Sequence, residues 1–174
     1  MKTFSAKKVA TLGVLTALSL IAFMLESLLP PLFIPGAKIG VANVFTLVCI
    51  CLLSPMDGII LVVARTVLSG VIVGSLSSMI YSLVAGLSAA VIMAVLYRFF
   101  KNSLSIVAVS VVGAAAHNAA QCIVFFLTTK SSAVFYYMPY LLAFGIFSGA
   151  AVGALATLAV RYGKSVLKSA QEKR

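Results

Sequence analysis

Polar side chains are scarce in this chain, so the few that fall within apolar stretches are its candidates for binding chemistry. Only three acidic residues and one histidine occur among 174 residues. A polar group in apolar surroundings is costly unless it is paired or binds something. We therefore predict binding roles for a small set of residues: Glu26, Lys38, Asn43, Arg65, His117, Asn118 and Gln121.

The densest group of these residues is His117, Asn118 and Gln121. His117 and Gln121 are four residues apart, which places them on one face of a helix, and Asn118 is adjacent. Alanines surround them at 114–116 and 119–120, and such small neighbours leave room for a ligand. An equally weighted alternative is that the alanines allow close helix packing while the polar groups bridge two helices.

Arg65 is the strongest single signal. A guanidinium inside an apolar stretch is expensive without a compensating charge, which an anionic ligand or Glu26 would provide. We favour a ligand-binding role for Arg65 over a structural interaction with Glu26 or with a helix-end carbonyl.

The segment from residue 30 to residue 40 is stiffened by three prolines and turned by two glycines. It contains one cation, Lys38, and leads into a predicted helix whose first turn carries Asn43. This arrangement suits a polar or anionic ligand at a helix N-terminus. The alternative is an ordered loop in which Lys38 extends to lipid headgroups.

The elements that hold these residues are predicted by composition. Hydrophobic residues make up 63% of the chain and charged residues 9%, which requires lipid as solvent. We predict an all-α integral membrane protein that forms a single membrane domain over residues 1–174, without a cofactor or metal. Runs of spanning length give six helices, at about 8–29, 41–53, 57–73, 79–100, 104–128 and 137–162.

The second and third helices are separated by Ser54-Pro55-Met56-Asp57, which is typical of a helix start. Serine caps, proline suits the first helical position, and aspartate meets the positive end of the helix dipole. Both helices look short for perpendicular spans. A re-entrant pair, with its turn buried in protein or lining a wet cavity, is therefore the alternative.

The basic residues predict the topology, because cytoplasmic segments are enriched in Lys and Arg. With the N-terminus inside, ten of the 13 basic residues are cytoplasmic, Lys38 and Lys130 are outside, and Arg65 is within a helix. Both termini are then cytoplasmic in a multi-pass protein of the cell membrane. The net charge of +10 thus needs no nucleic acid as partner.

The run Pro35-Gly36-Ala37-Lys38-Ile39-Gly40-Val41-Ala42-Asn43, which follows Glu26 and Pro30, resembles the Gx transporter family, also labelled heptaprenyl diphosphate synthase component I. The resemblance extends over nearly the whole chain. That family is similar to the S-components of energy-coupling factor (ECF) transporters. Those six-helix proteins capture a vitamin outside the cell and work with a coupling transmembrane subunit and paired ATPases.

The resemblance implies transport rather than catalysis. Prenyl diphosphate synthases hold Mg²⁺ with Asp-rich motifs, whereas no two acidic residues of this chain are near each other. We predict that the chain is not an enzyme. In S-components the first helix docks to the coupling subunit through small residues, commonly AxxxA. Here that role falls to Ala10, Gly13 and Ala17, which depart from this pattern.

Small residues also recur in the last predicted helix, at Gly145, Gly149 and Gly153. This double GxxxG pattern brings helix backbones close together. We favour internal packing over a partner interface.

The expected function is an S-component-like subunit for uptake of a small polar or anionic organic compound, a vitamin or a flavin- or quinone-related molecule. Partner ATPases would energise it. The alternative is a non-transporting membrane subunit of an electron-transfer or isoprenoid- or quinone-assembly complex. An autonomous carrier is disfavoured because the chain lacks an internal repeat of the kind that many carriers have.

Overall fold

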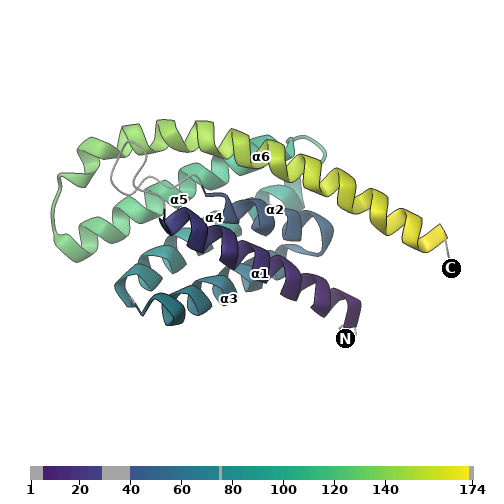
Figure 1. The fold of residues 1–174 in the computed structure, drawn as a ribbon. Coiled ribbons are helices and arrows are strands. Elements are labelled where there is room, and N and C mark those ends of the chain that lie inside the picture. Colours follow the sequence, from purple (N-terminus) through teal and green to yellow (C-terminus); the bar gives the residue numbers. More distant parts are fainter. Residues whose placement is uncertain (1–5, 29–39, 75, 173–174) are drawn as a thin grey trace.

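The computed structural model describes residues 6–28, 40–74 and 76–172, with side chains described as far as residue 165. The elements in these ranges are all helices, and they form one bundle (Figure 1). The prediction of a six-helix membrane bundle is confirmed. The helices are α1 (Ala6–Leu28), α2 (Ala42–Leu52), α3 (Pro55–Val73), α4 (Leu76–Phe100), α5 (Ile106–Thr129) and α6 (Val134–Glu172).

Five of the helices are long and apolar enough to cross a membrane, and α2, with 11 residues, is shorter. The last helix differs most from its predicted bounds of 137–162, because α6 begins at Val134 and continues to Glu172. The predicted end marked the end of the apolar run, whereas the chain after Tyr162 has no proline and contains several residues that favour helices, among them Lys, Leu, Ala, Gln and Glu. The basic C-terminal part of α6 therefore continues beyond the apolar span.

The turn between α2 and α3 is capped as predicted. The Ser54 hydroxyl accepts a hydrogen bond from the Asp57 backbone N–H at 3.3 Å, and Pro55 is the first residue of α3. The sequence did not predict the ion pair at this turn, in which Lys8 Nζ lies 2.8 Å from Asp57 Oδ2. The start of α3 is thus level with the start of α1.

Helix α2 is about half as long as a hydrocarbon core is thick. Its first residue, Ala42, accepts a hydrogen bond through its carbonyl from Ser19, near the middle of α1, at 3.0 Å. Eleven residues rise about 16 Å, roughly half of the hydrocarbon core. Helix α3, with 19 residues, rises about 28 Å and is long enough to span it. By length, α3 therefore fits a spanning helix and α2 does not.

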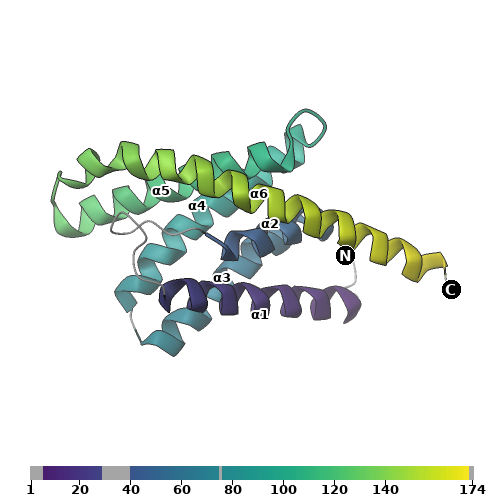
Figure 2. The ribbon, with the colours of Figure 1, turned by 45° about the horizontal axis from the view of Figure 1, so that its top comes forward.

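The core of the bundle lies around α2, which packs against α1, α3, α4 and α6. Figures 1 and 2 show α2 between α1 and α6, with the N- and C-terminal ends of the chain at the same end of the bundle. Side chains of α2 are fully buried here together with residues of α4, α5 and α6. This cluster includes Leu47, Ile50, Met93, Val109 and Ala156.

Helices α5 and α6 pack with nearly touching backbones. A Cβ atom at Gly149 would lie 2.9 Å from the Cα of Val111, and one at Gly153 would lie 2.6 Å from the Cα of Val107. The glycines of α6 thus serve internal packing, as favoured from the sequence.

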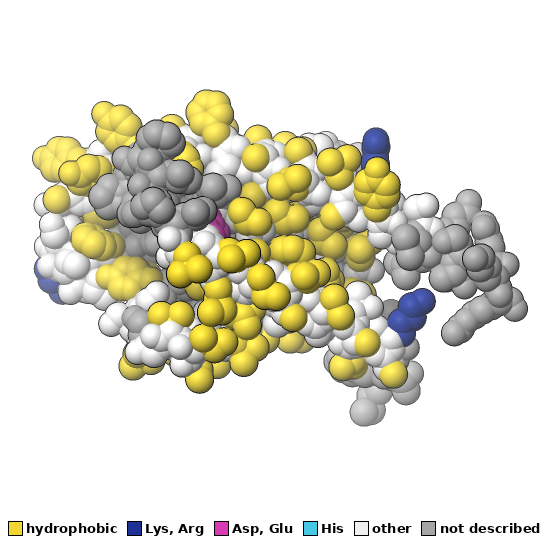
Figure 3. Space-filling model, in the orientation of Figure 1, with side chains coloured by type: hydrophobic (Ala, Val, Ile, Leu, Met, Phe, Trp, Pro, Cys, Tyr) yellow, Lys and Arg dark blue, Asp and Glu magenta, His cyan; other side chains and the backbone are white. Residues whose placement is uncertain are grey.

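The outer surface of the bundle is apolar. Figure 3 shows hydrophobic side chains over most of the visible face, with Lys and Arg side chains towards its two ends. In α1 only Ser19 and Glu26 are buried, whereas large side chains such as Val14, Ile21 and Leu25 are exposed. This surface faces lipid in a membrane protein.

Candidate ligand-binding site

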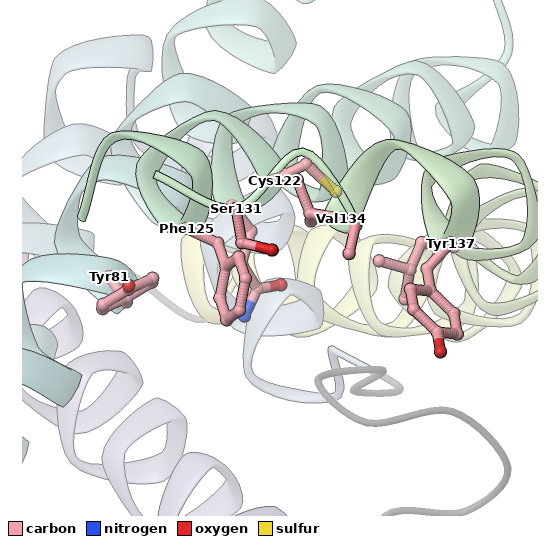
Figure 4. Close-up of a pocket in the computed structure, with 9 residues that line it drawn as sticks. Tyr81, Cys122, Phe125, Ser131, Val134 and Tyr137 are labelled. Atoms are coloured by element: carbon pink, nitrogen blue, oxygen red, sulfur yellow. The ribbon is translucent and has the colours of Figure 1, made fainter. Parts of the chain in front are cut away.

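A cavity of about 380 Å³ lies between α4, α5, α6 and the turn that joins α5 to α6 (Figure 4). It is close to the start of α4 and the end of α5, and so lies at the end of the bundle opposite to the chain termini (Figure 1). Nine residues line it: Tyr81, Gln121, Cys122, Phe125, Ser131, Ala133, Val134, Tyr137 and Leu141.

The wall of this cavity is mostly aromatic and aliphatic. Figure 4 shows Tyr81 and Tyr137 at opposite sides of the lining, with Phe125 between them. The Tyr81 hydroxyl forms a hydrogen bond with Thr128, which ties α4 to α5. Hydrogen-bonding capacity inside the cavity comes mainly from the amide of Gln121 and the hydroxyl of Ser131.

The α5–α6 turn positions one side of the cavity. Helix α5 ends at Thr129 and is capped by Lys130, whose φ of 56° is left-handed and whose backbone N–H donates a hydrogen bond to the carbonyl of Phe126. Phe126 and Phe135 pack across the turn with ring centroids 5.3 Å apart. The chain therefore reverses within a few residues, and the last turns of α5 face the first turns of α6.

A second cavity, of about 10 Å³, is lined by Asn43 and Gly40 together with residues of α4, α5 and α6. A volume of this size holds about one water molecule. It is too small for an organic ligand.

Arg65 forms a separate buried cluster with residues of α1. Its side chain is 3% exposed, its Nη1 lies 3.3 Å from the Ser19 Oγ, and its guanidinium carbon lies 5.7 Å from the centre of the Phe23 ring. Its Nε atom is buried without a hydrogen-bond partner among the described residues. Arg65 is thus held against α1 and is not among the described residues that line the larger cavity.

Glu26 provides the negative charge near this cluster. It is buried and attracts Arg65 electrostatically. Its Oε1 also accepts a hydrogen bond from the Gly40 backbone N–H at 2.5 Å. Glu26 therefore joins the end of α1 to the entry of α2.

Asn118 bridges two helices. Its Nδ2 donates a hydrogen bond to the carbonyl of Leu141 at 2.6 Å, in a space left open because Gly145 has no Cβ. The neighbouring His117 is half-buried and is not among the residues lining either cavity. Asn118 therefore makes the kind of contact between helices that the sequence suggested as the alternative to ligand binding for this group.

The predicted binding residues are thus distributed over several places. Gln121 lines the larger cavity, Asn43 lines the small one, and Glu26 and Arg65 attract each other electrostatically. Lys38 lies outside the described residues.

Sequence reasoning missed the aromatic residues of the cavity because it searched for polar groups in apolar runs. The signal present was the position of three aromatic residues near helix ends: Tyr81, Phe125 and Tyr137. Aromatic residues at such positions are normally interpreted as an interfacial belt.

The residues predicted to dock a partner lie on the outer side of α1. Ala10, Gly13 and Ala17 are all exposed. A Cβ atom added at Gly13 would have no neighbouring heavy atom within 4 Å. This face of α1 is therefore open within the described part of the chain.

Comparisons with known proteins agree with this architecture. A family model described as heptaprenyl diphosphate synthase component I matches residues 15–159. Among solved structures, the S component of a bacterial ECF transporter is similar with a TM-score of 0.71 and 18% sequence identity, covering 93% of this chain and 98% of that one. No curated protein matches the chain. At this identity the structural likeness establishes a shared fold.

Proposed function

This chain belongs to the heptaprenyl diphosphate synthase component I family, also called the Gx transporter family, and on that premise we propose that it is the substrate-binding subunit of an uptake system. The observation that carries the proposal is a ligand-sized cavity at one end of a bundle with the S-component fold. Cavities of about 300–1,000 Å³ are typical of small-molecule sites.

The charge distribution supports access from outside the cell. The end of the bundle that contains the start of α1 also contains four basic residues: Arg98, Lys101, Arg161 and Lys164. Lys130 lies at the opposite end, where the larger cavity is. Because basic residues concentrate on the cytoplasmic side, the cavity faces the outer side of the cell membrane. A ligand would then enter without crossing the bilayer first.

The acidic residues support a binding protein rather than a synthase. The Asp57 carboxylate is bound by Lys8 and by the Ser54 hydroxyl, and Glu26 accepts from Gly40 at the other end of α1. Magnesium-dependent diphosphate chemistry needs carboxylates that converge on the metal. The family label would then describe a partnership with a synthase.

The partners in this proposal are a coupling transmembrane subunit and paired ATPases. The open face of α1 around Ala10, Gly13 and Ala17 offers the small side chains that close helix packing in membranes requires. Docking there would leave the cavity, at the junction of α4, α5 and α6, free to bind its ligand.

The ligand in this proposal is a small organic compound, of the vitamin, flavin or quinone-related classes, contacted by Gln121. Ligand-binding roles for Glu26, Lys38, Asn43, Arg65, His117 and Asn118 stay predictions.

Affinity purification from the native membrane in mild detergent tests this function. We expect a coupling subunit and ATPases to copurify, and mass spectrometry to find a small molecule bound to the isolated chain. The double substitution Gly13→Leu and Ala17→Leu should abolish recovery of the partners and keep the small molecule. Val14→Leu, on a neighbouring exposed position, is the matched control. Recovery only with a redox protein or a prenyl synthase would favour the alternative function instead.

A further inference from the structure

The lining of the larger cavity is informative about what enters it. Three of its nine residues carry aromatic rings, and Cys122, Ala133, Val134 and Leu141 add apolar surface. None of the nine described lining residues carries a formal charge. The chemistry of this wall therefore differs from that of a site for a polar or anionic ligand, which the sequence led us to expect.

An ionised group would be poorly accommodated among these residues. It would lose hydration on entry, and the nine described lining residues offer it amide, hydroxyl and thiol groups rather than a counter-charge. Arg65 does not compensate, because it is buried against Ser19 and Phe23 of α1. Lys130 is exposed at the end of α5, one residue before Ser131, so it belongs to the rim of the cavity rather than its interior.

An uncharged ring system would be well accommodated. Aromatic side chains pack favourably on other rings in offset or edge-to-face geometry. The Gln121 amide provides both donors and an acceptor, so it can pair with a carbonyl or an amide on the ring. The volume of about 380 Å³ is at the lower end for ligand sites, which suits two or three fused rings.

We propose that the part of the ligand that enters this cavity is an uncharged, fused aromatic ring system, packed on Tyr81, Phe125 and Tyr137 and hydrogen-bonded by Gln121. This inference rests on the proposed function in one respect, since it takes the cavity as the substrate site. Any ionised substituent of the ligand remains outside the cavity, at its rim.

The test uses a pair of probes that share one ring system and differ in charge, 2-naphthamide and 2-naphthoate. Binding of each is measured by equilibrium dialysis at neutral pH, with the full chain in nanodiscs. We expect the amide to bind at least about tenfold more tightly than the carboxylate, because the carboxylate loses hydration without gaining a counter-charge. Ala133→Phe, which adds a ring at the cavity wall, should abolish amide binding and thereby separates binding at this site from partition into lipid.

A second variant tests the assigned role of Gln121. Gln121→Met keeps the length of the side chain and removes its hydrogen-bonding groups. It should weaken 2-naphthamide about three- to tenfold, the effect of one lost hydrogen bond, and leave unsubstituted naphthalene unchanged. An equal effect on both probes would show that Gln121 only shapes the cavity, and would overturn its part of the proposal.

Tighter binding of 2-naphthoate, blocked by Ala133→Phe, would overturn the uncharged class while retaining the cavity as a ligand site. Binding of the amide that is insensitive to Ala133→Phe would overturn the inference altogether. Neither result bears on recovery of the coupling subunit and ATPases, which is the separate measure of the proposed function.

Discussion

Lys8 Nζ lies 2.8 Å from Asp57 Oδ2, so an ion pair joins the first turn of α1 to the first turn of α3. It is one of the polar links that hold α1 to the rest of the bundle in the described part of the chain. Ser19 bonds Ala42 and Arg65 at mid-depth, and Glu26 bonds Gly40 at the far end. Because lipid is as apolar as the helix surface, such polar links and close packing determine how α1 is attached.

Breaking the Lys8–Asp57 pair should loosen the N-terminal end of α1. Asp57 is 2% exposed and Lys8 36%, so Lys8→Met leaves a buried carboxylate without its cation. We expect a loss of about 1–2 kcal/mol in the free energy of unfolding, below the value for a fully buried pair. The measurement is equilibrium unfolding in mixed micelles. The double variant with Asp57→Asn should lose less than the sum of the single losses, and strict additivity would show that the pair does not contribute.

Replacing Arg65 should destabilise the fold strongly. Arg65→Met removes the hydrogen bond to Ser19 and the charge that attracts the buried Glu26, and we expect a loss of about 2–4 kcal/mol, because a buried polar partner and a buried carboxylate are left less well compensated. Adding Glu26→Gln should restore part of the stability, which unfolding of both variants would reveal. The double variant also tests the predicted ligand role of Arg65 in a folded protein. A double variant that retains the native small molecule would contradict that role.

Substitution of Gly149 should separate α5 from α6. The Cβ of Gly149→Ala would meet the backbone of Val111 at 2.9 Å, so the helices must shift. Overpacking of this kind costs about 1–3 kcal/mol, which thermal unfolding in detergent would record. Gly13→Ala is the matched control, because a Cβ there has no neighbour within 4 Å. Equal effects at the two glycines would contradict the close packing.

Asn118 and Gln121 should respond differently to truncation. Asn118→Ala removes the hydrogen bond to the Leu141 carbonyl and should lower stability by about 0.5–2 kcal/mol. Gln121→Ala, in the cavity wall, should change stability less and reduce retention of the native small molecule. Unfolding and mass spectrometry, applied to both variants, distinguish these effects. Loss of the small molecule in Asn118→Ala at unchanged stability would support its predicted binding role instead.

The sequence by itself determined which segments form helices and how some of them begin and pack. Spans form because apolar runs partition into lipid and satisfy their backbone groups internally, which is a local property. The Ser54-Pro55 start is equally local, and the Gly149 and Gly153 spacing is a property of one helix face. These predictions needed no knowledge of neighbouring helices.

Only the tertiary structure decided which side chains meet. The depth and rotation of each helix depend on packing against all the others, so α2 starts at the level of Ser19 and Asp57 faces Lys8. The same rotation directs Asn118 to Leu141 and Gln121 to the cavity, although the two residues are nearly one helical turn apart. Residues of three helices form the wall of the cavity. Tyr81, Phe125 and Tyr137 are far apart in the sequence, so no single segment shows that they line the same cavity.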